Sequence, residues 1–167
     1  MSNLLVSAPI PPDGRLQVWN FDGTNTLQTR WKATADPNSP WTTPWTPFNP
    51  SPPGSPPGLF FDMTAGVLTD GRTQIWGVGF DAVTTTNKVY TSWKVSTDHN
   101  SLWSGWSEFD ITPMTAVGVQ PDGIAVAALP DKRLQLFIIG QFPAFKIWTA
   151  WKTTTDPNSP WTTLATF

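Results

Sequence analysis

Short apolar stretches separated by turn residues run along the whole chain, and no segment has apolar positions at helical spacing. In the first third of the sequence these stretches lie around residues 4–7, 16–19, 27–31 and 45–48. They contain β-branched and aromatic residues and are separated by Asp-Gly, Asn-Ser and Pro-Asn pairs, which is typical of short strands joined by turns. The pattern therefore predicts an all-β chain with four strands in this segment.

The same segment recurs twice further along the chain. A Trp-Lys pair followed by Asp-x-Asn-Ser-x-Trp begins at Trp31, Trp93 and Trp151, and an Asp-x-Arg-x-Gln block precedes each copy. A period of about 60 residues is close to that of propeller blades. We therefore predict a β-propeller of four-stranded blades with three blades per chain. The expected blades are residues 1–50, 59–110 and 111–167, with a Pro/Gly-rich linker at 51–58.

The first two strands of each blade are predicted to form a hairpin. Gly14 and Gly71 each follow an aspartate at this turn, and glycine enters positive φ values at little cost. The third copy has Lys132 at the equivalent position. It also carries an insertion at 111–123 that resembles a first strand followed by a Pro-Asp-Gly turn.

Composition and charge narrow the classes of function. The formal net charge is −2 and the ten basic residues are scattered, so nucleic acid is not an expected partner. Without cysteine there is no disulfide or thiolate chemistry. No apolar run is long enough to span a membrane. The N-terminus lacks the basic and apolar regions of a signal peptide, so we expect a cytoplasmic protein, or one released by a non-classical route.

The aspartate of the shared loop invites a catalytic interpretation, which the local pattern does not favour. Asp36, Asp98 and Asp156 each stand in Ser/Thr-x-Asp-x-Asn-x-x-Trp, a pattern similar to the Asp-box hairpin of propeller proteins. In such a turn the carboxylate accepts backbone hydrogen bonds. We expect the aspartates to hold turns, and the tryptophans at both ends of the loop to belong to the core: Trp31, Trp41, Trp93, Trp103, Trp151 and Trp161.

The residues for common hydrolytic sites are scarce. Glycoside hydrolysis uses a pair of carboxyl groups, but Glu108 is the single glutamate and most aspartates lie in turns. Tyr90 and His99 are also the single residues of their kinds, and His99 occupies a turn position that is proline in the other copies. The sequence thus predicts a protein that is not an enzyme and has no metal or cofactor.

Repetition without a single catalytic cluster favours a binding function. A sugar presents C–H groups on one face and hydroxyls at its edge, so its site combines an aromatic face with fixed donors and acceptors. The third copy departs from the others, because Leu164 replaces a tryptophan and Lys132 replaces a glycine, so its site is expected to be weak. The predicted sugar-binding residues are Trp45, Trp106, Arg15, Arg72, Arg133, Asn38, Asn100 and Asn158.

These motifs together resemble a known family. Asp-Gly-Arg-Leu-Gln-Val-Trp, then Trp-Lys, then Asp-Pro-Asn-Ser-Pro-Trp-Thr-x-x-Trp, is similar to the repeats of the seven-bladed propeller lectins of Photorhabdus bacteria. The resemblance covers nearly the whole chain outside the linker and the insertion. It implies multivalent, non-catalytic recognition of fucose-like or O-methylated monosaccharides in pockets between adjacent blades.

Three blades are fewer than the four to eight of typical propellers, so the ring is expected to close through a partner. A homodimer with six blades is preferred; a nine-bladed trimer and strand exchange are the alternatives. Two other functions stay open. One is a tectonin-type or Asp-box scaffold that binds a protein or lipopolysaccharide partner, and the other is a remnant or engineered fragment that binds nothing.

Overall fold

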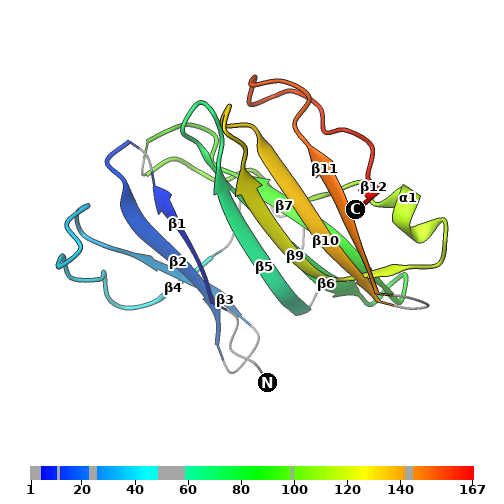
Figure 1. Ribbon diagram of the computed structural model, residues 1–167. Coiled ribbons are helices and arrows are strands. Elements are labelled where there is room, and N and C mark those ends of the chain that lie inside the picture. The colour runs from blue at the N-terminus through cyan, green and yellow to red at the C-terminus, as the bar shows by residue number, and fades with distance from the viewer. Residues whose placement is uncertain (1–4, 11, 23–25, 49–58, 99, 142–144) are drawn as a thin grey trace.

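The computed structural model describes residues 5–10, 12–22, 26–48, 59–98, 100–141 and 145–167. The predicted linker at 51–58 and His99 lie outside these residues. Within them the chain forms three antiparallel sheets of four strands, each built from consecutive strands (Figure 1). The all-β class with four strands per repeat is thereby confirmed.

The strand bounds show the repeat directly. The first sheet contains β1 (Leu5–Ile10), β2 (Arg15–Phe21), β3 (Leu27–Trp31) and β4 (Thr46–Pro47). The second sheet contains β5 (Leu59–Val67), β6 (Thr73–Asp81), β7 (Thr86–Trp93) and β8 (Ser107–Glu108). The third sheet contains β9 (Gln120–Ala128), β10 (Leu134–Gln141), β11 (Lys146–Trp151) and β12 (Ala165–Thr166).

The predicted hairpin turns lie between the first two strands of each sheet. Gly14 and Gly71 have φ values of 76° and 89°, in the left-handed region that glycine enters easily. Lys132 takes the same conformation with φ of 69°, although a side chain makes it unfavourable. Each turn is also held by an aspartate that accepts the backbone N–H of the arginine two residues later, as Asp70 does from Arg72 at 3.0 Å.

The insertion in the third copy differs from the prediction. Residues 121–123 do not form a turn, because they lie within β9 and pair with β10 beside an irregularity at Ile139/Gly140. The preceding residues form the short helix α1 (Thr112–Thr115), which is too short to show the periodic apolar pattern that would predict a helix. Met114 of this helix is fully buried. A Cβ on Gly140 would lie 2.3 Å from Val119 Cγ1, so glycine permits the close approach of this segment to β10.

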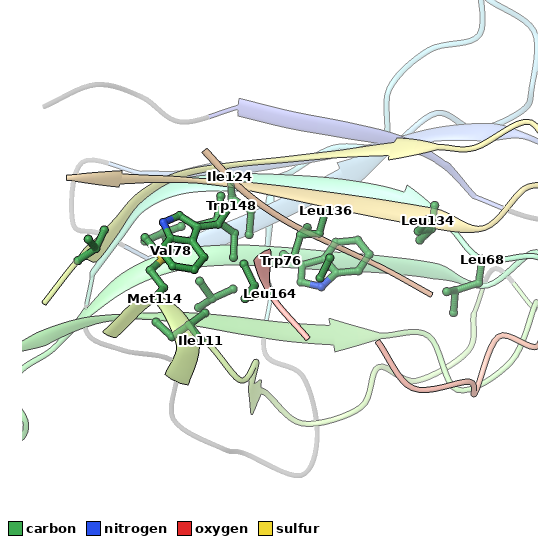
Figure 2. Close-up of a cluster of buried hydrophobic side chains, with 14 residues drawn as sticks. Leu68, Trp76, Val78, Ile111, Met114, Ile124, Leu134, Leu136, Trp148 and Leu164 are labelled. Atoms are coloured by element: carbon green, nitrogen blue, oxygen red, sulfur yellow. The ribbon is translucent and has the colours of Figure 1, made fainter. Parts of the chain in front are cut away.

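The sheets lie face against face, with their first strands side by side. Strand β5 packs against both β1 and β9 (Figure 1). One apolar core fills the space between the first and second sheets, and another fills the space between the second and third. Figure 2 shows the latter, with Trp76 and Val78 from β6 facing Leu134, Leu136 and Trp148.

The same aromatic arrangement recurs at both boundaries between sheets. Trp103, from the loop of the second sheet, packs edge-on against Phe48 and Trp19 of the first sheet, with centroid distances of 5.1 and 5.7 Å. Trp161 of the third sheet packs in the same way against Phe109 and Trp76, at 5.4 and 5.8 Å. Each loop tryptophan thus fastens its sheet to the preceding one.

Candidate functional site: two grooves between adjacent sheets

Each boundary between sheets opens into a groove. The first groove, between the first and second sheets, has a volume of about 260 Å³. The second groove, between the second and third sheets, is larger, at about 560 Å³. The first is lined by Gln17, Thr29, Trp31, Phe48, Lys94, Asn100 and Trp103. Repeat-equivalent residues line the second: Gln74, Thr91, Trp93, Phe109, Lys152, Asn158 and Trp161.

A glutamine and a threonine form a fixed polar pair in each groove. Gln17 Nε2 donates to Thr29 Oγ1 at 2.8 Å, and Gln74 Nε2 donates to Thr91 Oγ1 at the same distance. The threonine hydroxyl in turn donates to a backbone carbonyl, so the amide is held in one orientation. Gln17 Oε1 has no hydrogen-bond partner among the described residues. A ligand hydroxyl at this place would supply the donor that this buried acceptor lacks.

The aromatic surfaces of the grooves come from the tryptophans that precede the lysine of the Trp-Lys pair in each repeat. Trp31 and Trp93 line the first and second grooves and are half-buried. Trp151, the third member, is 36% exposed. These residues are the last of their strands, where the sheets diverge into the loops. The predicted place of these three residues in the core is therefore wrong, and Trp31 and Trp93 face the grooves.

Two predicted site residues meet across the second groove. Arg72, immediately before β6, donates from Nη2 to Asn158 Oδ1 in the loop of the third sheet at 3.1 Å. Its Nε also contacts Asp70 Oδ2 at 2.6 Å, which fixes the guanidinium. In the first groove Asn100 is a lining residue. Arg15 instead turns to its own sheet, where Nη1 donates to the Ala33 carbonyl at 3.3 Å.

The two predicted tryptophan platforms are placed differently. Trp106 is 8% exposed and packs against Phe60, with a centroid distance of 4.9 Å, so its ring belongs to the core and is not available to a ligand. Trp45 is half-buried, and the Arg30 guanidinium lies 4.5 Å from its ring centroid. The prediction that Trp106 offers its ring to a ligand is therefore wrong, because spacing alone does not tell which side of a sheet a residue faces, whereas the part of Trp45 in binding stays a prediction.

Asn38 and Arg133 lie on the outer sheets, where the described chain provides no neighbouring sheet. Arg133 Nη1 donates to the Lys152 carbonyl at 3.2 Å, and Asn38 belongs to the exposed loop of the first sheet. Arg133 is the repeat equivalent of Arg72, and Asn38 is the repeat equivalent of Asn158, but neither has the opposite wall of a groove in front of it in the described chain. Their part in binding stays a prediction.

The loop aspartates accept hydrogen bonds from backbone N–H groups of their own turns. Asp36, Asp98 and Asp156 each accept the N–H of the asparagine two residues later, at 2.7 to 2.8 Å. The carboxylate thus holds the turn and leaves the asparagine side chain to face outward, as Asn158 does toward Arg72. The identical Asp-x-Asn spacing in all three copies was the sequence signal that the aspartate holds the turn and the asparagine side chain is left to make other contacts.

Buried lysines reach into the same loops. Lys94 is 1% exposed and its Nζ donates to the Asp98 carbonyl at 3.4 Å, while Lys152 Nζ donates to the Pro157 and Ser159 carbonyls at 3.0 and 2.8 Å. Burial lowers the pKa of Lys94 to about 8 and also lowers the pKa of Lys152. The Trp-Lys pair present in every copy was the available signal for these lysines.

Acidic side chains distinguish the second groove from the first. Glu108 and Asp110 line the second groove, and Pro47 occupies the position of Glu108 in the first. Glu108 is paired with Lys88, which also contacts Asp81 at 2.8 Å. Hydrogen bonds from Lys88 hold the pKa of Asp81 well below its usual range.

Among the described residues no group of three or more metal-ligating side chains comes together, and no described helix has the length and apolar character needed to cross a membrane.

Comparison with known proteins identifies the fold. No protein-family profile matches the sequence, and no curated protein matches it significantly. Two solved structures of a polysaccharide lyase, the PL25 ulvan lyase, match the chain with TM-scores of 0.60 and 0.61 at 12% identity. One of them is bound to -[GlcA(1-4)Rha3S]-. Each match covers 96% of this chain, which spans 37% of the lyase chain.

The expectation that this protein is not an enzyme is overturned by this comparison, because both of these structures are of an enzyme. The carboxylate count behind that expectation applies to glycoside hydrolysis. It does not apply to other reactions on carbohydrates, such as proton abstraction next to a carbonyl group, which needs a single positioned base.

Proposed function

We propose that the chain binds carbohydrate in the two grooves between its sheets. The observation that carries this proposal is the repetition, at both boundaries, of a half-buried tryptophan beside a fixed glutamine–threonine pair and a loop asparagine. A tryptophan ring offers an apolar face to the C–H groups of a sugar, while amide and hydroxyl groups bind its edge. The second groove, with Arg72 and Lys152, is the principal site.

The ligand we propose is a 6-deoxyhexose or an O-methylated sugar. The resemblance to propeller lectins suggests fucose-like sugars, and the ligand bound to the ulvan lyase contains rhamnose, which is also a 6-deoxyhexose. The methyl group of such a sugar would contact the tryptophan, and its hydroxyls would reach the glutamine oxygen. The bound sugars of the lyase also carry acidic groups, to which Arg72 in the second groove would be a suitable partner.

Two grooves on one chain make the proposed binding multivalent. Shallow sugar sites of this kind bind individually in the micromolar to millimolar range, and linking them raises the apparent affinity for a glycan-coated surface by roughly 10² to 10⁴.

Binding is tested by a glycan array followed by titration calorimetry with L-fucose, L-rhamnose and their methyl glycosides. We expect saturable binding that free monosaccharide abolishes. The array should include sulfated and uronic-acid-containing oligosaccharides, because the second groove has basic residues. Failure of every saccharide to bind would refute the proposal. Retention of a protein or lipopolysaccharide without competition by monosaccharides would favour the scaffold function instead.

The comparison with the lyase favours a second candidate, eliminative cleavage of a uronic-acid polysaccharide. The ionisable side chains that line the second groove are Arg72, Glu108, Asp110 and Lys152. A lyase reaction removes the proton next to the uronate carboxylate and expels the 4-linked sugar, which leaves a double bond. The protein should therefore be incubated with a glucuronic-acid-containing polysaccharide while the ultraviolet absorbance of the unsaturated product is followed. No rise in absorbance would exclude this candidate for the substrates used.

A further inference from the structure

The outer face of the third sheet repeats an apolar surface that is covered elsewhere in the molecule. Leu27 and Phe48 are buried against the second sheet, and the equivalent Val89 is buried against the third. The third-sheet equivalents, Ile147 and Phe167, are 42% and 82% exposed. The same backbone hydrogen bond is present in all three sheets. The phenylalanine N–H donates to the carbonyl of the residue it pairs with at 2.8 Å in each: Phe48 to Leu27, Phe109 to Val89 and Phe167 to Ile147.

On this face the phenylalanine has no loop tryptophan of a following sheet packed against it in the described chain. At both internal boundaries, a phenylalanine of one sheet packs against the loop tryptophan of the next, Trp103 or Trp161. Phe167 keeps its partner within the third sheet, Phe137, at a centroid distance of 6.0 Å. No following loop tryptophan is supplied by the described chain. On the first sheet Trp41 occupies the repeat-equivalent loop position and is half-buried, and the described chain provides no preceding sheet to pack against it.

We propose that the first sheet of a second copy of this chain docks on the outer face of the third sheet. The second copy's Trp41 would fill the place taken by Trp103 and Trp161 at the internal boundaries. A contact of this head-to-tail kind closes when its rotation allows, and two copies then form a ring of six sheets with twofold symmetry.

The docking completes a third groove from residues of two chains. Arg133, Gln135 and Trp151 are the third-sheet equivalents of Arg72, Gln74 and Trp93, and Gln135 Nε2 already donates to Thr149 Oγ1 at 2.9 Å. The second copy would contribute its Lys32 and Asn38, the equivalents of Lys152 and Asn158. That this composite groove binds a sugar rests on the proposed function, whereas the docking itself does not.

The docking face of the first sheet is more polar than its internal equivalents. Gln28 and Arg30 occupy the positions of Tyr90 and Ser92, and Arg30 lies over the rings of both Trp45 and Trp41, at 4.5 and 5.4 Å from their centroids. Burying a guanidinium costs free energy unless it is paired. The contact between copies is therefore weaker than the boundaries within one chain, and it dissociates on dilution.

Sedimentation velocity over a range of protein concentrations tests the docking. We expect a monomer–dimer equilibrium. Phe167→Ala should weaken dimerisation by about tenfold or more, because it removes a central aromatic contact. Val83→Ala is the control and should leave the dimer unchanged, because this residue is 92% exposed and lies in the turn between β6 and β7 of the second sheet. A wild-type monomer at every concentration, or a Phe167→Ala variant that dimerises like wild type, would overturn the docking.

The mode of docking is tested from the opposite face. Arg30→Ser, which installs the residue present at the equivalent Ser92, should strengthen dimerisation, while Trp45→Glu should weaken it. In a head-to-tail contact the Phe167→Ala and Trp45→Glu variants, each weak alone, should form a mixed dimer through their one intact interface. If Trp45→Glu dimerises like wild type, the two third sheets pack against each other and the head-to-tail assignment is wrong.

The composite groove is tested by sugar stoichiometry. Calorimetry above the dimer dissociation constant should give one additional site per chain relative to Phe167→Ala. An equal number of sites in dimer and monomer would overturn the composite groove while leaving the two internal grooves in place. If no sugar binds either form, the proposed function fails with it, and the sedimentation experiments still decide the docking.

Discussion

Arg72 Nη2 donates a hydrogen bond of 3.1 Å to Asn158 Oδ1, and this bond joins the second sheet to the loop of the third. The arginine belongs to the Asp-Gly-Arg hairpin and the asparagine to the Asp-x-Asn turn, so both recurrent motifs of the sequence meet at one groove. Neither motif alone forms the site. Each sheet contributes one half of it, and the groove exists because adjacent repeats pack against each other.

The two tryptophans of the second repeat should respond differently to truncation. Trp93→Ala should abolish or strongly reduce sugar binding at the second groove while the protein remains folded, since the ring lines the groove and is half-buried. Trp106→Ala should instead lower the free energy of unfolding by about 3–5 kcal/mol, the usual cost of deleting a buried aromatic residue. Calorimetric titration and urea unfolding of both variants separate the two effects. The reverse result would return Trp106 to the site.

The loop aspartates should affect stability and leave sugar affinity almost unchanged. Asp98→Ala removes the acceptor of the Asn100 N–H and should lower the free energy of unfolding by about 1 kcal/mol. Asp98→Asn keeps an oxygen at this position and is the matched control, with a smaller loss. A variant that melts like wild type but no longer binds sugar would mean that the carboxylate contacts the ligand.

The stability of the protein should rise with pH in the alkaline range because of Lys94. Burial lowers the pKa of this amine to about 8 from its ordinary value of 10.5. Between these two values the unfolded chain holds a proton that the folded chain has released, so raising the pH favours the folded state. The free energy of unfolding, measured with urea, should therefore rise with pH across this window in the wild type relative to Lys94→Met. Lys146→Met, at an exposed lysine, is the control; a constant difference for Lys94→Met would refute the assignment.

The hairpin turn of the third sheet should be improved by glycine. Lys132 has φ of 69°, the conformation that Gly14 and Gly71 adopt in the other sheets. Replacing it by glycine relieves the strain of a left-handed residue, partly offset by the greater freedom of glycine in the unfolded chain. We expect Lys132→Gly to raise the free energy of unfolding by roughly 0.5–1 kcal/mol. Gly71→Ala, which introduces the strain, should do the opposite, and thermal melting of both variants measures the effect.

The repeats made much of the fold predictable, since strand composition, turn residues and equal spacing all indicated the same four-stranded unit. The helix α1 and the course of β9 could not be predicted in the same way. They occur in one copy only, and Pro-Asp-Gly at 121–123 has turn chemistry that the pairing of β9 with β10 overrides. In the candidate site, Arg72 and Asn158, which meet across the second groove, could be singled out because each stands in a motif that recurs. The place of Trp93 in the lining of this groove could not be predicted, because it depends on how two repeats pack against each other.

Two contacts between the second and third sheets lie apart from the hydrogen bond of Arg72. Asp62 Oδ2 accepts the Ile124 N–H at 2.7 Å, and the Asn87 N–H donates to Gln120 Oε1 at 2.9 Å. The two sheets are thus pinned near the start of β9 as well as at the loop, and the spacing between the walls of the second groove is set before any ligand arrives. A groove whose walls are fixed in this way would select ligands by width. A ligand of the right width would bind without moving β6 relative to β10, and a wider one would be excluded.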